Sequence, residues 1–201
     1  DANSEVWTVL KLINWTKDFF HKAHFEDPRL SAEILLAHAL HCRRIDLYTR
    51  FDYQPSPAEL ADFRSIVQRA RKYEPIAYII GEKEFYSLRF KVTPDCLVPR
   101  SETEALVREA VSQLKPLNRP TRAWDVCTGS GCVGIALASQ IKDVTVLCTD
   151  ISAPAVAIAV ENAQTNNVAD RVRCRIADLL ALPDDCRDLA PFDVITGNPP
   201  Y

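Results

Sequence analysis

Asn198, Pro199, Pro200 and Tyr201 form a run whose residue types can hold a planar amide or amine. Each proline fixes its φ and lacks an N–H group, so the backbone bends stiffly and its carbonyls point outward. The Asn198 side-chain oxygen and the Pro199 carbonyl could accept both hydrogens of an NH2 group, while Tyr201 could stack on its plane. The run predicts a site that presents a planar nitrogen to a methyl donor, and a plain loop after a strand is the alternative.

Glycine is scarce in this chain, and its placement is informative. Of five glycines, Gly129, Gly131 and Gly134 lie in one loop with G-x-G-x-x-G spacing. The loop follows a predicted strand and opens a predicted helix, so free backbone N–H groups could bind an anion or a cofactor carboxylate. A nicotinamide cofactor and S-adenosylmethionine (SAM) both fit this pattern, and a tight turn without a ligand is the alternative. The residues expected to line the cofactor here are Asp125, Cys127, Thr128, Gly129 and Gly131.

Two aspartates follow the next two predicted strands. Asp150 lies about 20 residues beyond the glycine loop, where an acid commonly holds ribose hydroxyls. Asp178 comes just after the third strand, where its carboxylate could accept a hydrogen bond from an adenine amine. A helix cap is the alternative for Asp150, and a turn aspartate is the alternative for Asp178. We expect the neighbouring Ile151 and Leu179 to line the same pocket.

The composition argues against several classes of protein. Of the 201 residues, 24 are Lys or Arg and 27 are Asp or Glu, so direct binding to nucleic acid is not expected. The seven cysteines include no C-x-x-C pair, which favours a reducing, cytoplasmic setting over disulfides or a zinc ribbon. We expect no membrane association, because no apolar run approaches membrane length. His21 and His24, like the pair at 38 and 41, are typical of helix surfaces, and we expect no metal site.

Residues 1–98 are expected to form two segments. Helical spacing of apolar residues predicts a helical bundle over residues 1–80. Asp27 and Ser56 each precede a proline and are expected to cap a helix, and Ser56 with Glu59 matches a capping box. Residues 81–98 alternate between polar and apolar types, which predicts a β-hairpin that links two domains.

In residues 99–201, strand patterns alternate with helical ones. Ser101 and Glu104 match a second capping box at the start of a helix. Strands are predicted at 123–126, 144–148, 172–176 and 192–196, with helices that begin at 132 and 152. This order predicts a Rossmann-like α/β fold, in which helices cover both faces of a parallel sheet and ligands bind beyond the carboxyl ends of the strands.

Further motifs match a known family. The segments 78–86 (YIIGEKEFY) and 97–104 (LVPRSETE), with the glycine loop and the run at 198–201, make the chain resemble the HemK/PrmC family. Its members are SAM-dependent protein-(glutamine-N5) methyltransferases that modify peptide-chain release factors. The resemblance covers essentially the whole chain. It implies a helical release-factor-recognition domain at 1–80, a hairpin linker at 81–98, and the N-terminal part of a SAM-dependent methyltransferase domain at 99–201.

The resemblance also implies roles for single residues. Gly129 and Gly131 would line the methionine part of SAM, Asp150 the ribose, and Asp178 with Leu179 the adenine. The residues implied to hold the glutamine amide during catalysis are Asn198, Pro199 and Tyr201, with Pro200 and Arg100 in the same wall.

The chain departs from the family pattern at two positions. Cys127 stands at the first glycine of D-x-G-x-G-x-G, where a side chain could crowd the cofactor or shift the turn. Ser101 replaces a proline and is expected to change only a helix cap. We also expect the chain to be part of a longer protein, because further strands would cover the edge beside residues 198–201. Two other functions stay open: adenine-N6 methylation of nucleic acid, and a non-catalytic module that binds a translation factor.

Overall fold

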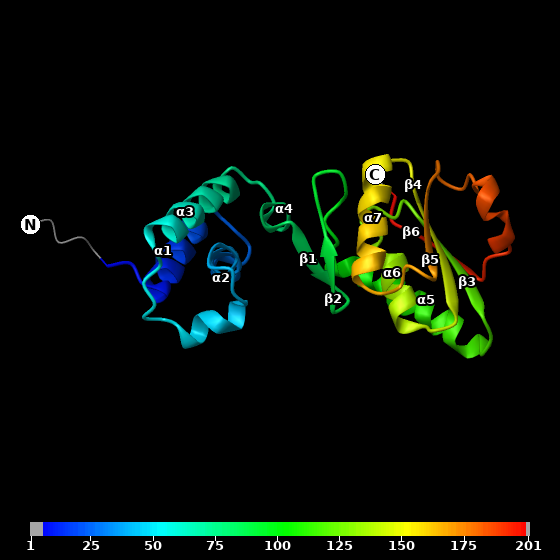
Figure 1. The fold of residues 1–201 in the computed structure, drawn as a ribbon, viewed down its shortest axis with the longest axis horizontal. Helices are drawn as coiled ribbons and strands as arrows, with labels where there is room; N and C mark the ends of the chain where they lie inside the picture. The colour runs from blue at the N-terminus through cyan, green and yellow to red at the C-terminus, as the bar shows by residue number, and fades with distance from the viewer. Residues whose placement is uncertain (1–5, 200–201) are drawn as a thin grey trace, which may run out of the picture. The chain divides into compact units, whose positions relative to one another are not determined.

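The computed structural model describes residues 6–199, which fall into two compact units divided between Ile80 and Gly81. Each unit has a hydrophobic core of its own. The elements of the first unit are α1 (Val9–Lys22), α2 (Pro28–Ala39), the 3-10 helix η1 (Arg44–Thr49), α3 (Pro57–Arg71) and α4 (Ile76–Ile80) (Figure 1).

The core of the helical unit comes from one face of α1 and of α3 and from most of the surface of α2, which lies between them in the core. Phe20 on α1, Leu35 and Leu36 on α2 and Val67 on α3 are almost completely buried in one cluster. Burial of each such side chain contributes roughly 1.5–3 kcal/mol. The helical bundle predicted for this part of the chain is therefore confirmed.

Glu33 is a charged side chain buried inside this unit. Its carboxylate accepts hydrogen bonds from Arg29 Nε at 2.9 Å, Arg44 Nη1 at 3.0 Å and Tyr48 OH at 2.8 Å. Burial alone would raise the pKa of Glu33, but these hydrogen bonds outweigh it and lower the pKa. Glu33 thereby fastens η1 to α2.

Both proline-marked helix starts are confirmed, but only one of the two caps is. Ser56 Oγ accepts from the Glu59 N–H at 3.3 Å, and Glu59 Oε2 accepts from the Ser56 N–H at 2.7 Å, which completes the predicted capping box. Helix α2 begins at Pro28 as predicted, yet the Asp27 side chain makes no capping hydrogen bond. Asp27 has φ −122° and ψ 76°, outside the extended conformation that aims a capping side chain at the helix.

The predicted hairpin is confirmed as β1 (Glu82–Phe85) and β2 (Leu88–Lys91), which pair antiparallel. Its two turn residues, Tyr86 and Ser87, both have positive φ, as a two-residue hairpin turn with the right twist requires. Phe85 and Phe90 are buried in the core of the second unit. The hairpin is thus packed into that unit rather than forming a free connection.

The second predicted capping box is wrong. The chain forms a 3-10 turn, η2 (Ser101–Thr103), before α5 (Glu104–Leu114), and no side chain caps α5. Glu104 Oε1 instead accepts from the Tyr86 N–H at 3.1 Å, so this carboxylate is committed to the hairpin turn. A contact between segments far apart in the chain has overridden a local pattern.

Four parallel strands form the central sheet of the second unit, in the order β5-β4-β3-β6. The elements that follow α5 are η3 (Lys115–Leu117), β3 (Thr121–Val126), α6 (Cys132–Gln140), β4 (Val144–Asp150), α7 (Ala153–Thr165), β5 (Val172–Ile176), η4 (Asp184–Leu189) and β6 (Val194–Gly197) (Figure 1). The predicted strands and helices are all present, although the last strand begins and ends later than the predicted 192–196.

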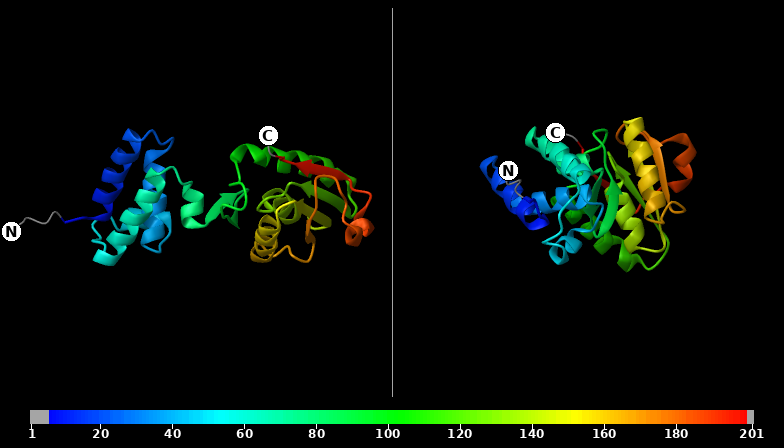
Figure 2. Two further views of the ribbon diagram at one scale, coloured as in Figure 1. Left: turned by 90° about the horizontal axis from the view of Figure 1, so that it is seen from above. Right: turned by 60° about the vertical axis from the view of Figure 1, so that its left-hand side comes forward.

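The two faces of the sheet are covered differently. One face packs against α5, α6 and α7, in a core that includes Ala123, Val146 and Cys174 (Figure 2). The other face carries Trp124 and Leu147, which pack against Cys186 and Leu189 of η4 among the described residues. Helices are predicted on both faces, but among residues 6–199 this second face is covered only by the short 3-10 helix η4.

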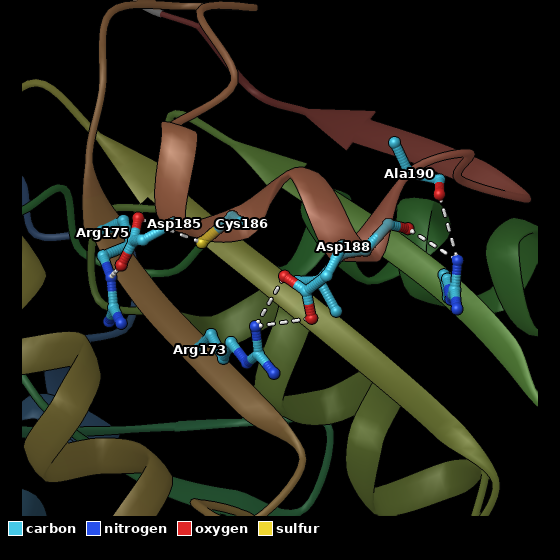
Figure 3. Close-up of polar contacts among 8 residues, drawn as sticks. Arg173, Arg175, Asp185, Cys186, Asp188 and Ala190 are labelled. Atoms are coloured by element: carbon cyan, nitrogen blue, oxygen red, sulfur yellow. Dashed lines mark hydrogen bonds and ion pairs between the residues drawn. The ribbon is translucent and has the colours of Figure 1, made fainter.

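Segment η4 is held to the sheet by burial and by ion pairs (Figure 3). Cys186 and Leu189 are buried, which supplies the main attachment. Arg173 Nη1 lies 3.0 Å from Asp188 Oδ1, and Arg175 Nε lies 2.6 Å from Asp185 Oδ2. These pairs are half-exposed, and such pairs contribute about 0–1 kcal/mol each.

No helix between residues 6 and 199 is long and apolar enough to cross a membrane. Within the same residues, no group of three or more His, Cys, Asp or Glu side chains is placed to hold a metal ion.

Candidate functional site

The carboxyl ends of the parallel strands surround a cavity of about 1180 Å³. It lies where the strand order reverses, because β4 and β6 lie on opposite sides of β3, and open parallel sheets bind ligands at such points. Its volume exceeds the roughly 300–1,000 Å³ of most small-molecule pockets, so it can accept more than one group. The predicted site residues on its wall are Arg100, Cys127, Gly129, Asp150, Ile151, Asp178, Leu179, Asn198 and Pro199.

The glycine loop between β3 and α6 turns through three residues of positive φ. These are Cys127 at 55°, Gly129 at 54° and Gly131 at 81°. A side chain at Gly131 would bring its Cβ within 2.8 Å of Ile135 Cδ1, so only glycine fits there without movement. Cys127 adopts the left-handed conformation that the family pattern leaves to glycine, and its side chain packs against the cluster that contains Trp124.

Asp150 ties the end of β4 to the glycine loop. Its Oδ2 accepts from the Gly129 N–H at 2.9 Å, and its Oδ1 accepts from the Ser152 N–H at 3.0 Å. The cap of α7 is Ser152, whose Oγ accepts from the Ala155 N–H at 3.3 Å. Helix capping is therefore not the role of Asp150. Each of its carboxylate oxygens keeps acceptor capacity for a further donor.

Asp125 and Thr128 lie behind the glycine loop. Both line a cavity of about 50 Å³ that shares Cys127, Gly129 and Asn198 with the large one. Thr128 Oγ1 donates a hydrogen bond to Asp125 Oδ2. The two residues predicted to contact the cofactor thus bond to each other, which holds the loop from its inner side.

The Asp125 carboxylate is fully buried and accepts two further hydrogen bonds. The Gly134 N–H donates to Oδ2 at 3.3 Å, and Thr196 Oγ1 donates to Oδ1 at 2.8 Å. Burial raises the pKa of Asp125 to about 6, although these hydrogen bonds oppose the shift. Asp125 therefore links the glycine loop, the first turn of α6 and β6.

Asn198 and Pro199 directly follow β6 and line the large cavity, opposite the acids at the ends of β4 and β5. Gly197 pairs with Val126 in the sheet, and a Cβ at Gly197 would lie 3.3 Å from the Val126 carbonyl oxygen. The backbone therefore approaches β3 closely just before Asn198. Pro200 and Tyr201, both predicted to hold the substrate, lie outside the described residues.

Asp178 and Leu179 form the turn after β5. The Ala181 N–H donates to the Asp178 carbonyl at 2.9 Å, and the Ala177 N–H donates to the Asp150 carbonyl at 3.0 Å. Leu179 has φ 44° and is 56% exposed, so an apolar side chain stands in strained backbone at the wall of the cavity. This exposed leucine is suited to contact a planar ring.

Two residues that sequence reasoning missed support the site. Asn162, buried on α7, donates from Nδ2 to the Ser130 carbonyl at 2.9 Å and to the Lys91 carbonyl at 3.0 Å. It thereby joins the glycine loop to the hairpin. Thr196 is the second, through its bond to Asp125. No motif marks either residue, because a buried asparagine in a helix and a threonine in a strand are common residue types.

Comparison with known proteins agrees with this geometry. Residues 103–201 match the family model described as the methyltransferase small domain, and residues 11–81 match the model described as the PrmC N-terminal domain. A parallel sheet with a glycine loop after one strand and an acid after the next is the frame on which such a domain is built. By its fold and by these family matches, the chain is a Rossmann-like methyltransferase.

The particular family follows from the relatives. The chain is 43% identical to the release factor glutamine methyltransferase of Rhodopirellula baltica, over 100% of this chain and 68% of the relative. It is 39% identical to the enzyme of the same name from Geobacter sulfurreducens, over 98% and 66%. The chain belongs to the release factor glutamine methyltransferase family, and it spans about two thirds of the length of these relatives.

Solved structures with a similar fold include the human methyltransferase 10 domain containing protein. The identity is 21%, the match covers 59% of this chain and 56% of the human one, and the TM-score is 0.47.

Proposed function

We propose that the chain carries out SAM-dependent N5-methylation of a glutamine side-chain amide in peptide-chain release factors. The observation that carries the proposal is the placement of Asn198 and Pro199 on the wall of the cavity that Gly129 and Asp150 also line. Family membership supplies the reaction and the class of substrate. The setting that follows is the cytoplasm, where release factors act.

The residues on the cavity wall fit SAM. In this proposal Asp150 binds the ribose hydroxyls, and Asp178 with Leu179 binds the adenine. Gly129 lines the cavity without a side chain, so the methionine part can approach the backbone there, whereas the missing side chain of Gly131 would meet Ile135 and Ala159 rather than the cavity. SAM supplies a methyl group already activated on a positively charged sulfur. The chain must therefore supply alignment more than acid or base catalysis.

The task of Asn198 and Pro199 is to orient the amide of the substrate. An amide nitrogen is a poor nucleophile, because its lone pair is delocalised into the carbonyl. The Asn198 side-chain oxygen and the Pro199 carbonyl accept the two N–H groups, which places electron density on that nitrogen and turns it toward the methyl donor. The extra proton of the product is strongly acidic and leaves to a carbonyl or to water, so no general base is required.

The two alternatives predict different partners. Adenine-N6 methylation would use the same grip on an exocyclic amine, but the excess of acidic over basic residues disfavours a nucleic-acid substrate. The chain would be a non-catalytic module if the side chain of Cys127 prevented SAM from binding at the glycine loop. Cys127 packs against the cluster that contains Trp124 and also lines the cavity, which still has a volume of about 1180 Å³.

Incubation with SAM and either a release factor or duplex DNA, followed by mass spectrometry, separates these functions. We expect one added methyl group on a glutamine of the release factor and none on the DNA. Methylation of the DNA alone would favour the adenine reaction. Failure of the chain to bind SAM in calorimetry, together with no transfer to either substrate, would favour the non-catalytic module.

A further inference from the structure

The strand that ends just before Asn198 is linked to the cofactor loop by the Asp125 carboxylate. Asp125 on β3 and Thr196 on β6 are directly paired in the register of the two parallel strands. Paired residues of neighbouring strands point to the same face, and Thr196 Oγ1 donates to Asp125 Oδ1 at 2.8 Å. The opposite oxygen, Oδ2, accepts from the Thr128 hydroxyl and the Gly134 N–H.

Both partners are shielded from water. Asp125 is 2% exposed and Thr196 is 8% exposed. A hydrogen bond to an ionised group in such a place is stronger than one at the surface, and its geometry is held by the surrounding packing. Thr196 stands two residues before Asn198, so a shift of β6 along β3 would move the asparagine by the same amount.

We propose that Asp125 and Thr196 act as a positioning pair, which sets the distance between the SAM-binding loop and the Asn198 corner that holds the substrate amide. The inference rests on the proposed function and adds a role for two residues that contact neither the methyl group nor the amide. Asp125 holds the SAM-binding loop through Oδ2 and β6 through Oδ1. One side chain therefore couples the position of the loop to the position of the Asn198 corner.

The protonation state of Asp125 controls this link. An ionised carboxylate can accept from Thr196, Thr128 and Gly134 together, whereas a protonated one must give up acceptor capacity and donate instead. Burial raises the pKa of Asp125, and Asp150 at the end of β4 raises it further. Among residues 6–199, the other titratable groups that interact with the Asp125 charge are the thiols of Cys127, Cys132, Cys148 and Cys174.

The test is the Thr196→Val substitution, which keeps the shape of the side chain and removes the donor. In the full chain with SAM and release factor, we expect kcat to fall by about 10- to 100-fold, since a misplacement of about 1 Å can cost that much. The Kd for SAM, measured by calorimetry, should change by less than about threefold, because the contacts of the cofactor remain. Thr196→Ser restores the donor and should restore most of kcat.

A matched control exists on the same sheet. Thr121, at the opposite end of β3, is also buried, and its hydroxyl has no hydrogen-bond partner among residues 6–199. Thr121→Val removes an equivalent hydroxyl without touching the link, so it should leave kcat unchanged. A loss in Thr121→Val equal to that in Thr196→Val would show that any buried hydroxyl matters, and it would overturn the positioning pair.

The pH profile distinguishes positioning from a merely structural role. In Thr196→Val the ionised Asp125 carboxylate loses a hydrogen-bond donor, which raises its pKa further. The acidic limb of the pH profile of kcat should therefore move to higher pH by about 1 unit. An unmoved limb together with wild-type kcat would overturn the inference while leaving the proposed function intact. Absence of methyl transfer in the unaltered protein would instead overturn the proposed function on which the inference rests.

Discussion

The Gly129 amide donates to Asp150 Oδ2 at 2.9 Å, and this bond spans 21 positions of the chain to join the cofactor loop to the end of the neighbouring strand. One carboxylate thus holds the shape of the loop while it faces the cavity. Its position at the end of β4 gives it the task of loop support and, in the proposed function, that of ribose binding, and both should fail together when it is removed.

Asp150→Ala should weaken SAM binding by about 10- to 100-fold, because a charged acceptor of about 1.5–3 kcal/mol is lost. The measurement is isothermal titration calorimetry with SAM. Asp170→Ala serves as the control, since the Asp170 side chain is 74% exposed in a loop remote from the cavity wall. Equal affinity in Asp150→Ala and the unaltered protein would contradict the ribose role.

Cys127 offers a test of the loop conformation. Cys127→Val places a β-branched side chain at φ 55°, and we expect a loss of about 1–2 kcal/mol in the free energy of unfolding. Cys127→Gly relieves the strained backbone but increases the conformational entropy of the unfolded chain. These effects oppose each other, so the free energy of unfolding should stay within about 1 kcal/mol of the original. Urea unfolding measures both. A Cys127→Val protein as stable as the unaltered one would contradict a left-handed backbone conformation at residue 127.

The raised pKa of Asp125 makes the free energy of unfolding depend on pH. Burial raises its pKa to about 6 in the folded chain, above the value near 3.9 in an unfolded one. The folded state then holds a proton that the unfolded state has lost, so this group lowers the free energy of unfolding as pH rises from about 4 to about 6. The contribution is on the order of 2–3 kcal/mol.

Asp125→Asn should remove that contribution. Relative to the unaltered protein, its free energy of unfolding should therefore rise between pH 4 and pH 7. Urea unfolding at both pH values gives the difference directly, and groups common to the two proteins cancel. A difference that stays constant or falls with pH would contradict a raised pKa at Asp125.

We expect the buried carboxylate of Glu33 to stabilise the helical unit. Glu33→Ala removes a buried acceptor of three hydrogen bonds, and we expect a loss of about 1–3 kcal/mol in the free energy of unfolding. The loss stays below that of a fully buried ion pair, because Arg29 and Arg44 are half-exposed and can turn to water. Glu26→Ala, at an exposed position, should leave the urea midpoint unchanged. A Glu33→Ala protein with the same urea midpoint as this control would show that the three hydrogen bonds of Glu33 do not stabilise the unit.

Much of the second unit could be predicted, because its signals are local. Gly129, Gly131 and Asp150 stand at strand ends, where backbone conformation and ligand chemistry restrict the residue type. The parallel sheet, and a ligand site beyond the carboxyl ends of its strands, follow from the alternation of strands and helices. The same locality explains why the capping box of Ser56 and Glu59 is present as predicted.

The features that could not be predicted depend on contacts between distant segments. Ser101 and Glu104 have the same spacing as Ser56 and Glu59, yet Glu104 bonds to Tyr86 of the hairpin. Thr196 and Asn162 act through partners far away in the sequence. Residue types so common carry no signal by themselves, and their roles emerge only when the chain is folded.

Asn198→Ala tests the grip on the substrate amide most directly. In single-turnover assays with SAM and release factor, we expect methyl transfer to the glutamine to be abolished, while calorimetry finds SAM binding close to that of the unaltered protein. Asn14→Ala, exposed on α1, controls for the loss of an asparagine elsewhere. Transfer at the original rate in Asn198→Ala, or equal loss of transfer and SAM binding, would contradict the role of Asn198 in holding the amide.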